Sequence, residues 1–183
     1  MRKLVVTENI TLDGIVDLAG GWFDPLGAEV DQSDINEVIA EQRAAADALL
    51  LGRNTFEAFR EFWPKQSEDP TGVSDYLNRV SKYVIANAMD DPGWDNTTVL
   101  RGPLLDEVQA LKDRPGGDVV VTGSIQLVQS LIAADIVDEY RLFVYPVVIG
   151  HGARLFESAD IRLALQETRQ FKSGVVLLRY ASA

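Results

Sequence analysis

The sequence has 183 residues, of which 46% are hydrophobic, and its formal net charge is −11. A chain of this length buries roughly 70% of its unfolded surface, so we expect a single domain over residues 1–183. The acidic charge argues against general binding to nucleic acid or to an anionic membrane. With no cysteine and only His151 as a histidine, we expect neither a thiolate metal site nor a histidine cluster.

Nothing in the sequence indicates a membrane segment or a secretory leader. No run of about 20 apolar residues could span a bilayer. The first fourteen residues, MRKLVVTENITLDG, include charged and polar residues where a secretory signal would keep its apolar core. We therefore expect a cytoplasmic protein.

The first two thirds of the chain alternate between predicted strands and helices. A short strand at 4–7 precedes a helix that begins at Ser33, and strands follow at 47–51, 82–88, 97–100 and 118–121, with helices after 55, 104 and 124. The consecutive valines 119–121 cannot alternate between core and solvent, so both faces of that strand should be covered. This pattern predicts an α/β fold with three layers, in which helices cover both faces of a mainly parallel sheet.

The last third changes character. Residues 139–148 read as a long strand that contains Pro146, which indicates an edge or a bulge. Two further strands, at 163–171 and 175–180, are joined by a short turn at 172–174. Such a hairpin predicts antiparallel strands added to the parallel sheet, so the sheet is expected to be mixed.

Two glycine turns resemble each other. Gly52 follows one apolar strand and precedes a helix for which Thr55 is the expected cap, and Gly123 separates the 118–121 strand from the next helix. Helix starts at one edge of a parallel sheet present unpaired amides that attract phosphate. Arg53 can grip phosphate oxygens through two parallel hydrogen bonds. The alternative is an ordinary strand-to-helix turn in which glycine serves geometry alone.

Five segments, taken together, carry a family resemblance: ITLDG (10–14), LLLGRNTFEAF (49–59), KYVIANA (82–88), VVVTGSIQLVQSL (119–131) and IVDEYRLFVYPVVIGHGARLF (136–156). In order and spacing the chain resembles the dihydrofolate-reductase-like superfamily, and it looks most like the reductase domain of riboflavin biosynthesis and its stand-alone relatives. The resemblance implies an eight-stranded mixed sheet and an NADPH-dependent reductase or a descendant of one. It also makes a homodimer plausible.

The resemblance places the cofactor NADPH on the two turns and on three other segments. The positions that match the family's cofactor site are Leu12, Gly14, Gly52, Arg53, Thr55, Asn87, Arg101, Gly123, Ser124, Ile125 and Leu127. Two arginines near the 2′-phosphate would favour NADPH over NADH, because NADH lacks that group. Arg101 could equally be a solvated surface residue.

The catalytic candidates are Asp13, Asn36 and Glu37. Asp13 lies in the loop that the resemblance puts beside the nicotinamide. In dihydrofolate reductases a carboxylate on the helix before the Gly-Arg turn holds the substrate, and counting back from Gly52 puts Asn36 at that position. Asparagine cannot supply a proton as a carboxylic acid does, which weighs against dihydrofolate as the main substrate. The neighbours Asp34 and Glu37, or Asp31 just before the helix, could take over after a small shift, or these acidic residues could simply favour the helix dipole.

Two functions therefore stay open at this point. One is an NADPH-dependent reductase that transfers a hydride to a small heterocycle of pyrimidine or pteridine type, like 5-amino-6-(5-phosphoribosylamino)uracil reductase or dihydrofolate reductase. The other is a nucleotide-binding or regulatory protein of the same fold without turnover. A kinase is disfavoured because the sequence lacks a G-x-x-x-x-G-K-[ST] phosphate loop.

Overall fold

The computed structural model describes residues 1–18, 21–23, 31–66, 69–157 and 159–183. In these residues eight strands form one sheet, in the order β4-β3-β2-β5-β1-β6-β8-β7. The strands are β1 (Leu4–Thr11), β2 (Ala46–Gly52), β3 (Ser81–Ile85), β4 (Thr97–Leu100), β5 (Asp118–Val121), β6 (Glu139–Tyr145), β7 (Leu163–Gln170) and β8 (Val176–Ser182). The helices are α1 (Ser33–Ala45), α2 (Arg53–Phe62), the 3-10 turn η1 (Trp63–Lys65), α3 (Val73–Arg79), α4 (Leu104–Lys112) and α5 (Ile125–Ala133).

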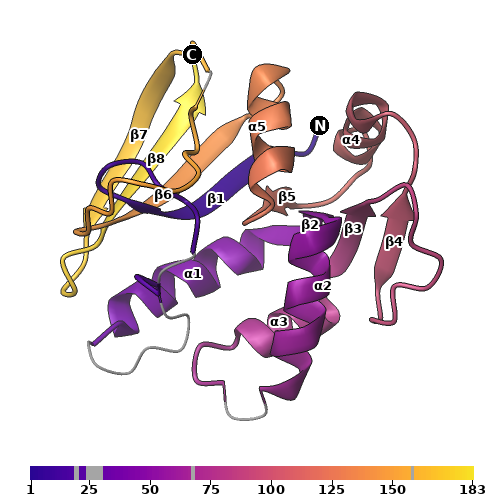
Figure 1. Ribbon diagram of the computed structural model, residues 1–183, viewed down its shortest axis with the longest axis horizontal. Helices are drawn as coiled ribbons and strands as arrows, with labels where there is room; N and C mark the ends of the chain where they lie inside the picture. Colours follow the sequence, from indigo (N-terminus) through magenta and orange to yellow (C-terminus); the bar gives the residue numbers. More distant parts are fainter. Residues whose placement is uncertain (19–20, 24–30, 67–68, 158) are drawn as a thin grey trace.

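The sheet is mixed, as the sequence predicts. Strands β1 to β6 pair in parallel, with β5 between β1 and β2. Strands β7 and β8 form an antiparallel hairpin that joins the sheet through β6 (Figure 1). The predicted α/β fold with a mostly parallel sheet and antiparallel C-terminal strands is confirmed.

Helices cover both faces of this sheet, which gives three layers. On one face, α4 and α5 pack on alternate residues of β1, β2 and β5, including Val6, Leu50 and Val121. On the other face, α2 and α3 pack on the opposite set of β2 residues, such as Leu49. Helix α1 covers the same second face at β6 and β8, where it meets Phe143. Among the described residues, no helix combines the length and apolarity that a membrane crossing requires.

Three strand ends differ from the sequence predictions by at least three residues, and the others by two or fewer. Strand β1 continues to Thr11 instead of ending at Thr7, because its polar second half pairs with β6 up to Tyr145. Strand β3 ends at Ile85, and β6 ends at Tyr145 immediately before Pro146, whose missing amide hydrogen cannot join a ladder. The extension of β1 matters most, because it carries residues 8 and 9 into the sheet.

Candidate active site

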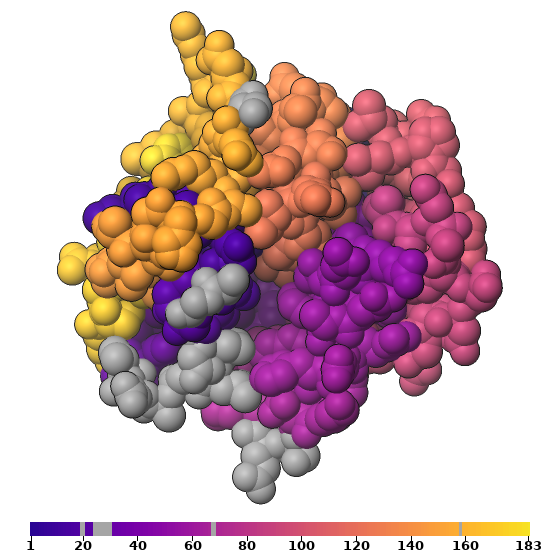
Figure 2. Space-filling view, viewed as in Figure 1, coloured from indigo at the N-terminus to yellow at the C-terminus, as the bar shows by residue number. Residues whose placement is uncertain are grey.

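A cavity of about 1080 Å³ opens at the carboxyl ends of the parallel strands. It forms because β5 pairs with β1 only along Leu4–Val6 and then turns away, whereas β1 continues to Thr11. Figure 2 shows a hollow on this face, where the N-terminal segment, α2 and α5 meet. In open α/β sheets such a crevice is the usual place for a ligand.

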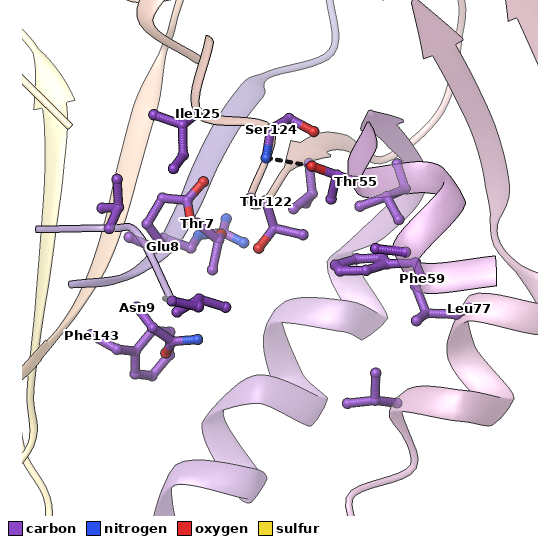
Figure 3. Close-up of a pocket in the computed structure, with 18 of the residues that line it drawn as sticks. Thr7, Glu8, Asn9, Thr55, Phe59, Leu77, Thr122, Ser124, Ile125 and Phe143 are labelled. Carbon is purple, nitrogen blue, oxygen red and sulfur yellow. Dashed lines mark hydrogen bonds between the residues drawn. The ribbon is translucent and has the colours of Figure 1, made fainter. Parts of the chain in front are cut away.

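The two glycine turns meet directly at this crevice. The Ser124 backbone amide donates a hydrogen bond of 2.9 Å to Thr55 Oγ1 (Figure 3). The Gly52 amide donates one of 2.9 Å to Ser124 Oγ. Gly123 and Ser124 both adopt left-handed backbone conformations, with φ of 60° and 51°. The turns that the sequence singled out are therefore one structure, built from the starts of α2 and α5.

The prediction that Thr55 caps α2 is wrong. The helix begins at Arg53, with Gly52 at its N-cap position and no side-chain cap. The Thr55 hydroxyl instead accepts the Ser124 amide from the other turn. The start of α5 likewise carries no side-chain cap. First-turn amides of both helices thus keep hydrogen-bonding capacity at the cavity.

Seven of the predicted cofactor residues line the cavity, and four do not. Those that line it are Gly52, Arg53, Thr55, Gly123, Ser124, Ile125 and Leu127. Leu12, Gly14, Asn87 and Arg101 are not among its lining residues. The residues of the two turns are therefore brought together, while those that follow β1, β3 and β4 lie outside the cavity.

Arg53 and Arg101 nevertheless converge on the segment that follows β3. Arg53 Nη1 donates to the Ala88 carbonyl at 3.2 Å, and Arg101 Nη2 donates to the Met89 carbonyl at 2.6 Å. Arg53 also pairs with Glu57 at 2.8 Å. Asn87 is exposed beside the same carbonyls. Two guanidinium groups thus hold adjacent carbonyls at the outer end of the Gly52 turn.

Asp13 anchors a loop outside the cavity. Its carboxylate accepts hydrogen bonds from Thr11 Oγ1 at 2.6 Å and from the Gly150 amide at 2.8 Å. The Thr11 hydroxyl and then the Gly150 amide hold the pKa of Asp13 below its usual value. Asp13 therefore ties the end of β1 to the turn after β6, while Leu12 beside it is 68% exposed.

The two helix candidates separate on α1. Asn36 lines the cavity, whereas Glu37 is exposed and is not one of the lining residues. Residues on successive positions of a helix point about 100° apart, so only one of them can face the sheet edge. No carboxylate of α1 lines the cavity in the part of the chain that the structure describes.

Glu8 is a residue that the sequence analysis missed. It lines the cavity from β1 yet is only 5% exposed, and its Oε1 has no hydrogen-bond partner among the described residues. Burial raises the pKa of Glu8 well above its ordinary value, and the Gly123 backbone amide lowers it by less. The sequence could have indicated Glu8 if the first strand had been predicted to extend past position 8. Glu8 would then share one face of that strand with the apolar residues Val6 and Ile10.

Part of the remaining wall of the cavity is apolar. Phe59 and Leu77 line it from α2 and α3, and Phe143 lines it from β6 (Figure 3). Aromatic and aliphatic side chains of this kind suit a flat ring, which can stack on them. The cavity therefore offers an anion-binding end at the turns, an apolar wall and one buried carboxyl group.

Comparisons with known proteins agree with this architecture. The family model described as the RibD C-terminal domain matches residues 2–177. YyaP of Bacillus subtilis (strain 168), an uncharacterized protein, is 31% identical over 188 residues, covering 98% of this chain and 94% of YyaP. A pyrimidine reductase-like protein from Corynebacterium diphtheriae superposes with a TM-score of 0.67 at 17% identity, covering 100% of this chain and 92% of that one. Dihydrofolate reductase from Enterococcus faecalis, solved with NADP(H), has a TM-score of 0.64 at 17% identity, covering 98% and 96%.

Proposed function

Because the chain belongs to the family of RibD C-terminal domains, we propose that it is an NADPH-dependent reductase of a small heterocycle of pyrimidine or pteridine type. The observation that carries this proposal is the pair of hydrogen bonds, each 2.9 Å, that join the Gly52 and Gly123 turns at the mouth of the cavity. These bonds bring the first turns of α2 and α5 together, and a ligand with two linked phosphates needs the free amides of two helix starts close together. The same fold binds NADP(H) in the dihydrofolate reductase of Enterococcus faecalis.

The residues at the turns fit such a cofactor. A Cβ atom added at Gly123 would lie 3.0 Å from Thr55 Cγ2, on a backbone with φ of 60° that favours glycine. Neither α2 nor α5 has a side-chain cap at its start, so backbone amides there are available to donate to phosphate oxygens. Arg53, at 52% side-chain exposure, lies beside them and is free to exchange its contact with Glu57 for a phosphate.

The convergence of Arg53 and Arg101 supports NADPH over NADH. Both guanidinium groups donate to adjacent carbonyls, of Ala88 and Met89, so a third group between them would meet two cations. A 2′-phosphate accepts charge-assisted hydrogen bonds from arginine that a hydroxyl cannot match. Asn87, exposed at the same place, adds a neutral donor.

The chain's own contribution to the reaction is position and exclusion of water. When bound, the reduced nicotinamide would supply the hydride. The apolar wall of Phe59, Leu77 and Phe143 would align an acceptor ring against it and keep bulk water away. The side-chain amide of Asn36, which lines the cavity, would form hydrogen bonds with the polar edge of that ring. These bonds would select the substrate, but the amide would not supply a proton to it.

Thermal unfolding tests the cofactor assignment. A ligand at about 100 times its Kd stabilises a protein by about 2.7 kcal/mol. We expect NADPH to raise Tm clearly more than NADH at equal concentration, and Arg53→Ala to remove most of that increase. Arg162→Ala, a change at an exposed arginine outside the cavity, should leave it intact. Equal shifts with both nucleotides, or none, would overturn the assignment.

A second measurement separates a reductase from a silent binder. Pteridines, pyrimidines and simple carbonyls are mixed with protein and NADPH, and the absorbance of the reduced nicotinamide is followed. Loss of absorbance with a pyrimidine or pteridine supports the proposed reductase. Strong NADPH binding with no acceptor consumed would favour the regulatory alternative, to which the absence of a carboxylate at Asn36 points.

A further inference from the structure

Glu8 lies where the sheet opens. Val6 is the last β1 residue that pairs with β5, and two positions later the Glu8 side chain leaves β1 on the same face as Val6 and Ile10. The chain leaving β5 turns at Gly123, whose backbone amide lowers the pKa of the Glu8 carboxyl by less than burial raises it. The carboxyl group thus occupies the gap that β5 vacates.

One oxygen of this carboxyl has no partner. Glu8 Oε1 is buried and makes no hydrogen bond to any described residue, although Glu8 lines the cavity. Leaving a buried polar atom unpaired destabilises the folded protein, because the atom loses its hydrogen bonds to water without gaining others. An unpartnered atom of this kind at a cavity wall indicates that a bound ligand supplies the missing hydrogen-bond partner.

Among the residues that the structure describes, no cation forms an ion pair with Glu8 or lowers its pKa. Arg141 of the neighbouring strand also lines the cavity, but it is opposite Thr7, so its side chain leaves the sheet on the other face. Its Nε and Nη2 are held by Glu139 and Asp118, and its buried Nη1 has no hydrogen-bond partner among the described residues. The other arginines that line the cavity are engaged elsewhere, Arg43 with the Thr71 carbonyl and Arg53 with Glu57. A buried carboxyl without a cation keeps its proton, in line with the raised pKa of Glu8.

We propose that Glu8 is the proton donor of this site, with its unpartnered Oε1 facing the reacting heterocycle. This inference rests on the proposed reductase function. In the reduction of a C=N or C=O bond, the acceptor carbon gains a hydride from the reduced nicotinamide, and the nitrogen or oxygen gains the Glu8 proton. The double bond becomes single, the nicotinamide is oxidised, and Glu8 is left as a carboxylate that water reprotonates.

The other candidates cannot fill this role. The hydrogen bonds that Asp13 accepts favour its ionised form, and it lies outside the cavity. Asn36 lines the cavity but carries no acidic proton. Glu8 therefore replaces, from β1, the acid that the sequence analysis sought on the helix.

Carbon-13 NMR of protein labelled at the glutamate carboxyl carbons tests the inference without turnover. The signal missing in Glu8→Gln, or displaced in Glu8→Asp, assigns Glu8. At neutral pH it should lie at the position of a carboxylic acid. Adding NADPH should move this signal, whereas 2′-phospho-ADP-ribose, which lacks the nicotinamide, should not. A Glu8 signal at the carboxylate position in the free protein overturns the inference.

The same titration separates this inference from the cofactor proposal. If both nucleotides raise Tm but neither moves the Glu8 signal, the cofactor proposal stands and the proton-donor role fails. If neither nucleotide raises Tm, the proposed function itself fails. The two ligands differ only at the ring end, so a response to NADPH alone places Glu8 at that end.

Turnover of any acceptor found in the substrate scan gives the kinetic test. A positioned general acid contributes about 100-fold or more to the rate. Glu8→Gln keeps the shape of the side chain but cannot give up a proton, so kcat should fall by at least this factor while the NADPH-induced increase in Tm is retained. Glu167→Gln, on β7 outside the cavity, should leave kcat unchanged. An unchanged kcat in Glu8→Gln would contradict the assignment.

Discussion

The two ends of the parallel strands carry opposite kinds of polar chemistry. At the amino ends most charged groups described here are paired with a group of opposite charge, as in Arg2–Asp47, Lys3–Glu139, Lys112–Asp138, Arg141–Asp118 and Arg141–Glu139, and the buried Lys82 of β3 donates to the Leu77 and Val80 carbonyls. At the carboxyl ends, two helix starts lack side-chain caps and Glu8 Oε1 lacks a partner. This difference indicates that polar groups at the amino ends stabilise the sheet, whereas those at the carboxyl ends are available to a ligand.

Gly117 gives the largest expected effect at the amino ends. A Cβ atom there would lie 2.4 Å from the Ala45 backbone carbonyl oxygen, which cannot move without shifting the start of β2. Gly117→Ala should lower the free energy of unfolding by about 3 kcal/mol, the upper part of the range for overpacking. Urea denaturation measures the change.

Gly52 is the matched control at the carboxyl ends. Its φ of −77° suits alanine, and an added Cβ atom would lie 3.6 Å from Ser124, an ordinary contact. Gly52→Ala should therefore change the free energy of unfolding little, or raise it slightly. Equal losses in the two variants would show that both ends are packed alike, which would break the comparison.

The buried Glu8 carboxyl predicts a pH dependence of stability, smaller than the effect of Gly117→Ala. The unfolded chain ionises Glu8 near its ordinary pKa of 4.5, whereas burial holds the folded pKa well above it. The folded protein thus binds more protons, so stability falls as pH rises from about 4.5 through the raised pKa. Glu8→Gln removes this loss, since an amide does not titrate.

The measurement is the difference in the free energy of unfolding between the wild type and Glu8→Gln as a function of pH. The wild type should lose stability relative to the variant over that range and show a constant difference below it. Glu167→Gln on β7, which removes a half-exposed partner of Arg179, controls for the loss of one carboxylate. A difference that does not vary with pH would mean that Glu8 ionises as freely in the folded protein as in the unfolded chain.

Much of the fold could be predicted because apolar runs fix which strands are buried. The valines at 119–121 required cover on both faces, and β5 lies between β1 and β2 with helices on each side. The end of β1 could not be found this way. Residues 7–9, Thr-Glu-Asn, are polar and resemble a loop, yet they pair with Arg141–Phe143 of β6. Their place depends on a partner strand far along the chain.

The candidate site also contains residues that local sequence could predict and residues that it could not. The Gly52 and Gly123 turns follow apolar strands, so local sequence sufficed to select them, and the structure joins them through Ser124 and Thr55. Glu8 carries no local signal, because a single glutamate between threonine and asparagine is ordinary at a surface. Only the strand register and the early turn at Gly123 bury it. Asp13, by contrast, looked reactive in sequence but is engaged in anchoring a loop.

The smallest expected effect is that of replacing Arg101. This replacement tests whether the ligand-binding region at the carboxyl ends of the strands extends beyond the cavity. Arg101 is exposed and donates to the Met89 carbonyl at 2.6 Å, so its contribution to a bound phosphate is screened by solvent. Arg101→Ala should weaken NADPH binding by about 1 kcal/mol or less and leave NADH binding as it is. Arg101→Lys keeps the charge but loses the second donor of the guanidinium group. Compared with Arg101→Ala, it should therefore restore part of the preference for NADPH over NADH. Calorimetric titration with both nucleotides measures this, and equal weakening of NADPH and NADH would mean that Arg101 supports the Met89 segment without reading the phosphate.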